Sequence, residues 1–237
     1  MINNADIFFY VGAGMEPWAQ DIIDAAGRKF TPLDASSKAT LLKADEYERG
    51  GEHDVEEHHH GEYDPHIWLD FENDKKLVDA VADALVQKDL ENRNYYLNNA
   101  REYKQKLDVL DGKYSQTLSN CKHDVFVTGG HSAYAYIARR YNLTYIAAYG
   151  VSPDSDPTPS RIKAITDVTK EHGIKYVLME ELVSPRLAKA ISEESEAEVL
   201  VFNPAHNLKK EQFDRGETFI SIMDNNLLNL KTALECG

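Results

Sequence analysis

Short apolar runs alternate with longer amphipathic segments in the second half of the chain, and this alternation restricts the fold more than any other feature. Buried strands are predicted by length and by β-branched or aromatic content at residues 124–128, 144–148, 175–179 and 198–202. Helices are predicted between and after them, at residues 132–141, 160–172, 185–195 and 216–234. Because parallel strands need crossover helices, the pattern predicts an α/β fold with a parallel sheet flanked by helices.

The first half of the chain shows related elements in a less regular order. The run ADIFFYV predicts a strand at residues 5–11, and a helix at 17–26, a short strand at 29–33 and an amphipathic helix at 71–86 follow. A longer helix is predicted at residues 92–118; it would span roughly 40 Å and could connect two domains. We therefore expect an N-terminal lobe at 1–90, a linking helix at 91–119 and a second α/β lobe at 120–237.

Composition excludes some classes of function. The 42% hydrophobic and 28% charged residues are typical of a globular chain that buries a core. The net charge of −14 argues against a nucleic-acid partner, because phosphate binding requires basic patches. No apolar run approaches the roughly 20 residues of a membrane span, and the first residues lack the pattern of a signal peptide. Cys121 and Cys236 have no metal-binding spacing and predict no disulfide framework.

Residues 52–70 read EHDVEEHHHGEYDPHIWLD and hold five histidines among acidic residues. The part up to Gly61 has no apolar periodicity, so we expect a His-rich loop at 49–62. His66 differs, because it lies in an apolar frame just before a helix for which Asp70 is a suitable N-cap. The residues alone leave open whether His66 is a metal ligand and the remaining histidines an accessory loop: His53, His58, His59 and His60.

Further candidate ligands follow the predicted strands of the second half. Ligands of open parallel sheets bind beyond the carboxyl ends of the strands. His131 follows the strand at 124–128, the pair Glu180-Glu181 follows the third strand, and His206 comes shortly after the fourth. Taken singly, either histidine could be a helix cap or a loop residue. Their joint placement favours a metal site, and imidazole with some carboxylate suits zinc.

The sequence resembles the metal-binding receptors of zinc and manganese ABC importers, the cluster A-I solute-binding proteins. The segments that carry the resemblance cover almost the whole chain in order: ADIFFYVGAGMEPW, DPHIWLD, YYLNNAREYKQKLDVLDGKY, FVTGGHSAYAYIARRYNLT, GVSPDSDPTPSRI, VLMEELVSPRLAKAI and EVLVFNP. The resemblance implies two α/β lobes joined by one long rigid helix, with the metal site in the cleft between the lobes.

The resemblance also implies the ligands. The family's ligand positions fall on His66, on His131 and, after the Asn-Pro of VFNPAH, on His206, where the family often has a carboxylate. Glu181 is the next acidic candidate. A histidine at position 131 resembles the zinc branch and a glutamate would resemble the manganese branch, so Zn(II) is expected ahead of Mn(II).

In the family, a first strand and a first histidine ligand precede the segment that matches residues 2–12. Here Met1 stands almost directly before that segment. We therefore expect an incomplete first lobe without its export signal. A bare apolar strand at residues 5–11 is then expected to make the fragment self-associate.

The resemblance implies a receptor, not an enzyme, that captures zinc and delivers it to an ABC-transporter membrane permease. Its expected location is the cell surface, as a lipoprotein, or the periplasm. One alternative is a zinc-dependent hydrolase with Glu181 as general base, although the chain has no His-Glu-x-x-His helix. The other is a zinc buffer or adhesin-type surface protein that works through its histidine loop.

Overall fold

The structure is a computed structural model that describes residues 4–27, 29–44, 62–148, 159–180 and 185–237. The chain divides into two compact units. Among the described residues, the first unit takes those up to 43 and from 62 to 109, and the second takes residue 44 and those from 110 onward. Each unit is built around parallel strands and helices, which confirms the predicted α/β class.

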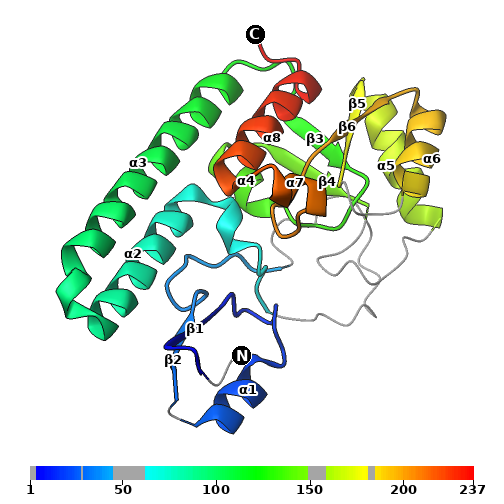
Figure 1. Ribbon diagram of the computed structural model, residues 1–237. Helices are drawn as coiled ribbons and strands as arrows, with labels where there is room; N and C mark the ends of the chain where they lie inside the picture. Colours follow the sequence, from blue (N-terminus) through cyan, green and yellow to red (C-terminus); the bar gives the residue numbers. More distant parts are fainter. Residues whose placement is uncertain (1–3, 28, 45–61, 149–158, 181–184) are drawn as a thin grey trace. The chain divides into compact units, whose positions relative to one another are not determined.

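The first unit contains a strand–helix–strand motif. Strand β1 (Ile7–Tyr10) pairs in parallel with β2 (Thr31–Asp34), and helix α1 (Ala19–Ala26) connects them (Figure 1). The ring of Phe8 lies 5.3 Å from that of Phe30, so an apolar side chain of β1 packs within this motif. Within the described residues β1 pairs with β2 alone. The expected self-association through β1 stays a prediction.

The rest of the first unit leads into its principal helix. A single 3-10 turn (Ile67–Leu69) precedes helix α2 (Phe71–Lys88), and the Asp70 carboxylate accepts a 2.9 Å hydrogen bond from the Glu72 N–H as the predicted N-cap. The buried Asn73 side chain accepts from Thr40 N–H at 2.8 Å and donates to Thr40 C=O at 3.1 Å. This pair of bonds ties the segment before the His-rich loop to α2.

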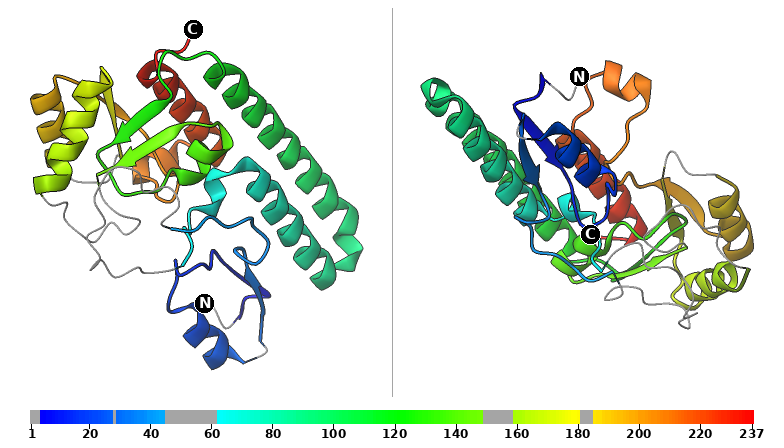
Figure 2. Two further views of the ribbon diagram at one scale, coloured as in Figure 1. Left: turned by 180° about the vertical axis from the view of Figure 1, so that it is seen from behind. Right: turned by 90° about the horizontal axis from the view of Figure 1, so that it is seen from below.

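Helix α3 (Arg93–Leu118) is the long helix that the sequence predicts, and it follows a short 3-10 turn (Leu90–Asn92). Its first part lies alongside α2 (Figures 1 and 2), where Lys75 meets Asp108 at 2.9 Å and Lys104 meets Asp79 at 2.6 Å. These ion pairs are exposed, so the apolar faces of the helices contribute more to their packing. In the described part of the chain, no helix is long and apolar enough to cross a membrane.

The second unit contains a four-stranded parallel sheet in the order β4-β3-β5-β6. Its strands are β3 (Val125–Thr128), β4 (Thr144–Ala147), β5 (Tyr176–Met179) and β6 (Glu198–Val201). Its helices are α4 (Ala135–Arg140), α5 (Pro159–Glu171), α6 (Pro185–Ser195), α7 (Lys210–Asp214) and α8 (Phe219–Ala233).

Side chains that alternate along β3 pack on different faces of this sheet. Val125 and Val127 join a core cluster with Ile165 of α5 and Ile191 of α6. Phe126, which lies between the two valines, instead stacks on other aromatic rings. Since successive strand side chains point to opposite faces, β3 is buried on both, as its uninterrupted apolar run predicts.

Two helices begin three residues later than the sequence predicts, and one short helix was not predicted. Helix α4 begins at Ala135 and not at residue 132, because the backbone before it hydrogen-bonds with side chains of other elements. Helix α8 begins at Phe219 and not at 216, because Gly216 adopts a φ of +75° and the Thr218 hydroxyl caps the helix. The short helix α7 was missed, since five residues carry little periodic signal.

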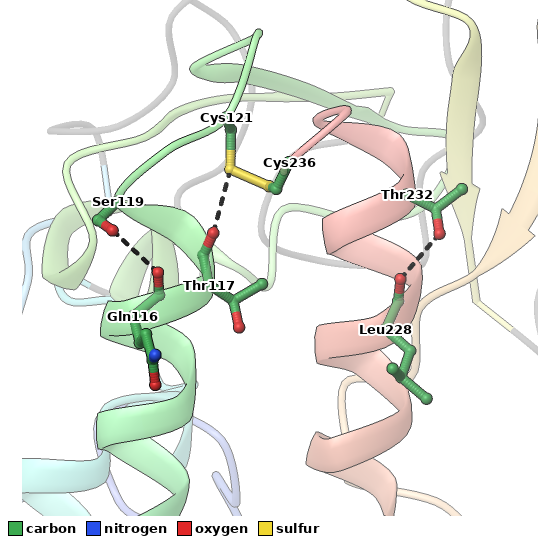
Figure 3. Close-up of a disulfide and its surroundings, with 7 residues drawn as sticks. All are labelled: Gln116, Thr117, Ser119, Cys121, Leu228, Thr232 and Cys236. Carbon is green, nitrogen blue, oxygen red and sulfur yellow. Dashed lines mark hydrogen bonds between the residues drawn. A yellow bond between two sulfur atoms is a disulfide. The ribbon is translucent and has the colours of Figure 1, made fainter.

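A disulfide joins Cys121 to Cys236, a pairing that the sequence did not predict (Figure 3). Cys121 follows the end of α3, and Cys236 follows the end of α8. Backbone bonds support the junction, because Lys122 N–H and His123 N–H both donate to Leu234 C=O at 3.1 Å. A separation of 115 residues leaves no spacing pattern from which the pairing could be predicted.

Replacing both cysteines by serine should lower the stability of the second unit. In the chain-entropy treatment, a disulfide that closes a loop of this length stabilises by about 4 to 5 kcal/mol. The urea midpoint of the Cys121→Ser/Cys236→Ser protein should therefore fall well below that of the oxidised protein. A reductant should shift the parent protein and leave the double variant unchanged. Equal midpoints for the oxidised and reduced parent would contradict this expectation.

Candidate metal centre

In the first unit, His66 is oriented by a carboxylate two residues earlier in the chain. Asp64 Oδ1 accepts a 2.9 Å hydrogen bond from His66 N–H and lies 2.7 Å from Nδ1 of the same residue. Both side chains are buried. An ionised carboxylate only accepts, so it holds the proton on Nδ1 and leaves the imidazole lone pair on Nε2. This is the orientation that a metal-binding histidine requires.

In the second unit, His131 is oriented by a carboxylate in the same manner. Glu180 Oε1 accepts from His131 N–H at 3.0 Å and lies 2.7 Å from Nδ1. His131 follows β3 and Glu180 follows the neighbouring strand β5, so the sheet brings together residues that are 49 positions apart. Both side chains are buried, and the lone pair of His131 is again on Nε2.

Gly130 is the residue that permits this pairing. A Cβ atom at this position would lie 2.1 Å from Glu180 Oε1, far inside van der Waals contact. Any other residue would displace the carboxylate from His131. The glycine before the histidine is therefore required by the close approach of the Glu180 side chain.

The third histidine, His206, lies in the turn that follows β6. The buried Asn226 side chain fixes this turn: its Oδ1 accepts from Asn203 N–H at 2.9 Å and its Nδ2 donates to Asn203 C=O at 2.7 Å. Ala205 N–H donates to the Asn203 side chain at 2.8 Å. His206 is exposed, and its ring centroid lies 5.6 Å from that of His131. Ring nitrogens of the two histidines lie within 4.8 Å of each other.

The second unit thus brings two of the predicted ligands, His131 and His206, into a pair that could share one ion. His66 has a matching local environment in the first unit. Glu181 and the loop histidines His53, His58, His59 and His60 lie outside the described residues, so their predicted roles stay predictions.

Sequence reasoning missed the two orienting carboxylates. Asp64 could have been recognised from the sequence, because an aspartate side chain can accept a hydrogen bond from the backbone N–H two residues later, here that of His66. For Glu180 the position directly after a buried strand was recognised, but Glu181 was selected from the pair. Asn226 had no signal, since its role depends on how α8 packs against the turn after β6.

Comparison with known proteins then decides the family. The sequence matches the family profile of ZnuA, the zinc-uptake complex component A, periplasmic, over residues 1–233. The chain belongs to the ZnuA family. The family resemblance found in the sequence is thereby confirmed.

Relatives within and around the ZnuA family are similar along nearly the whole chain. The zinc-binding lipoprotein AdcA of Streptococcus pneumoniae TIGR4 is 36% identical over 231 residues, which cover 97% of this chain and 46% of AdcA. The high-affinity zinc uptake system protein ZnuA of Bacillus subtilis 168 is 33% identical, with 98% of this chain and 73% of that protein covered. The chain spans about half the length of the AdcA relatives that it matches.

Solved structures support the same fold. The Zn(II)-bound ZnuA-like domain of S. pneumoniae AdcA superimposes with a TM-score of 0.79 at 33% identity, covering 99% of this chain and 82% of that domain. The laminin-binding protein Lbp of Streptococcus pyogenes gives a TM-score of 0.79 at 28% identity, with 98% of this chain and 82% of Lbp covered. The α/β fold that the resemblance implied is thus the fold of ZnuA-like proteins.

Replacing Gly130 by alanine should break the contact between Glu180 and His131. The displaced carboxylate would leave buried polar groups poorly paired, so the free energy of unfolding should fall by about 1–3 kcal/mol. Gly112→Ala is a matched control, because a Cβ there meets nothing within 4 Å, and alanine should stabilise α3 by up to about 1 kcal/mol. Urea denaturation measures both changes. Equal stability of the two variants would contradict the assignment.

Proposed function

We propose that this chain is a zinc receptor that binds Zn(II) through His66, His131 and His206 and delivers it to the membrane permease of an ABC-type importer. The observation that carries the proposal is the carboxylate-oriented His131 beside His206, in a member of the ZnuA family. His66, oriented in the same way by Asp64, is the ligand proposed from the first unit. Glu181 is the acidic candidate for a further ligand.

The chemistry of the proposed ligands favours zinc over manganese. All three are imidazoles, which suit Zn(II), while Mn(II) prefers sites rich in oxygen ligands. The carboxylates paired with His66 and His131 fix the orientation and tautomer of each ring. Zn(II) is here the transported cargo, so the proposed activity is binding and release without a chemical step. The division into lobes at 1–90 and 120–237, linked by 91–119, belongs to the same proposal.

An extracytoplasmic location is part of the same proposal. Disulfides persist in oxidising compartments, and Cys121 is bonded to Cys236 in the second unit. The AdcA relative is named a lipoprotein, and the family description is periplasmic. We propose that this chain works on the outer side of the cytoplasmic membrane, where it would collect zinc for import.

Adhesion is a second candidate function. It is favoured by the similarity to the laminin-binding protein Lbp, which has a TM-score of 0.79. Direct binding of the chain to immobilised laminin, with and without zinc, would test it. Such binding would add to zinc capture and would not replace it.

Alanine substitutions of the histidines test the proposed receptor function. Substitution of His66, His131 or His206 should each lower zinc affinity by more than roughly 10- to 100-fold. That range is the usual loss when a residue that only hydrogen-bonds to a metal ligand is removed. His123→Ala is the control, because this histidine lies 3.3 Å from Glu235 and takes no part in the proposed site. Competition with a chromogenic zinc chelator measures the affinities, and an added Mn(II) arm should show weaker binding. Unchanged affinity in His131→Ala would defeat the proposal.

Deleting residues 52–61 should leave the tight zinc site in place. The loop histidines lie in a glycine-bounded polar segment, so each would lose considerable conformational entropy on binding metal. The shortened protein should keep one tight site and lose only weaker binding, as titration to saturation would measure. Loss of sub-micromolar binding would show instead that the loop supplies a ligand. A chain that buffers zinc through its loop would lose most of its capacity.

A further inference from the structure

Four aromatic side chains form a closed ring of contacts in the second unit, next to the turns that carry His131 and His206. Tyr145 of β4 stacks on Phe126 of β3 with a centroid distance of 4.9 Å and meets Tyr134 edge to face at 5.8 Å. Tyr134 lies 4.4 Å from Phe202, which in turn lies 6.1 Å from Phe126. All four are buried, so the two tyrosine hydroxyls must find partners inside the protein.

The Tyr145 hydroxyl contacts the turn that contains His131. It donates to His131 C=O at 3.0 Å and accepts from Ala133 N–H at 3.3 Å. The same Ala133 N–H also donates to His131 C=O at 3.0 Å. The Thr128 hydroxyl lies 3.1 Å away. Glu180 thus fixes the N–H and imidazole of His131, while Tyr145 fixes its carbonyl group. His131 is therefore held through both its side chain and its backbone.

The Tyr134 hydroxyl contacts the other turn. It donates a 2.5 Å hydrogen bond to Phe202 C=O, at the point where the chain leaves β6. Residues 203–206 follow directly and end at His206. Tyr134 follows His131 by three positions. Its side chain therefore connects the segment just after His131 to the segment just before His206. Its burial raises its pKa well above the ordinary value, and the hydroxyl stays a donor.

We propose that Tyr134 and Tyr145 are positioning residues, whose hydroxyls hold the turns of His131 and His206 at the spacing that one zinc ion requires. The inference rests on the proposed function. Neither tyrosine needs to touch the metal. A ligand pair that is already ordered loses less conformational entropy on binding, so the benefit should appear as tighter zinc binding.

Phenylalanine substitutions separate this role from ring packing. Tyr145→Phe keeps the aromatic contacts but leaves His131 C=O and Ala133 N–H without the hydroxyl, and Tyr134→Phe does the same to Phe202 C=O. We expect each variant to bind zinc roughly 10- to 100-fold more weakly, as for other outer-shell partners. The matched control is Tyr141→Phe, which removes a 2.7 Å hydrogen bond to Asp111 elsewhere in the same unit.

The experiment combines three measurements on the full chain. Chelator competition gives zinc affinity for the parent and the three tyrosine variants, with His131→Ala as the variant that lacks a proposed ligand. The visible absorption of bound Co(II) reports ligand geometry and should change in Tyr134→Phe and Tyr145→Phe but not in Tyr141→Phe. Hydrogen exchange of the Ala133 amide in metal-free protein should become faster in Tyr145→Phe and stay unchanged in Tyr141→Phe. A general loss of stability would instead make this exchange faster in both variants.

The outcomes distinguish this inference from the proposed function. If the parent binds zinc tightly and loses it in His131→Ala, but the two phenylalanine variants match Tyr141→Phe in affinity and Co(II) spectrum, the positioning role is overturned and the receptor function stands. If the parent binds no zinc, both fail. If affinity falls and the Co(II) spectrum changes in Tyr134→Phe and Tyr145→Phe alone, the positioning role is supported.

Discussion

The buried hydrogen bonds between Glu180 and His131 are the interaction on which the geometry of the second unit's site depends. A buried carboxylate is costly unless donors surround it, and His131 supplies both its N–H and its Nδ1. The pair forms only because β3 and β5 are neighbours in the parallel sheet, with Thr128 opposite Leu178. The close approach of the carboxylate explains the glycine at position 130, and the engaged backbone explains why α4 begins late.

The same chemical device is built in two ways within one chain. His66 receives its carboxylate locally, from Asp64 two positions earlier, through a turn that a short peptide could form. His131 receives its carboxylate from another strand, so its orientation requires the folded sheet. A metal ligand of the first kind can be fixed by its own segment. A ligand of the second kind is only as well ordered as the surrounding aromatic contacts and hydrogen bonds of the sheet.

A covalent cross-link also holds the second unit together, at the end of α3. The disulfide joins the chain just after α3 to the chain just after α8 (Figure 3). Lys122 N–H and His123 N–H, which follow Cys121 in the chain, donate to Leu234 C=O. The Glu235 carboxylate accepts hydrogen bonds from Lys175 and from Lys122, and these lower its pKa to about 2. It therefore stays ionised at neutral pH.

The sequence by itself determined the α/β class, the long helix and the family, and it predicted which histidines are candidate ligands. Strand and helix signals depend on local periodicity, and Asp70 caps α2 as its position predicts. The histidines could be selected because strand ends gather at one edge of a parallel sheet. Only the tertiary structure decided that Glu180 orients His131, that Asn226 fixes the turn before His206, and that Cys121 bonds to Cys236. Each of these joins residues far apart in the chain, and such pairings depend on strand order and helix packing, which no local pattern encodes.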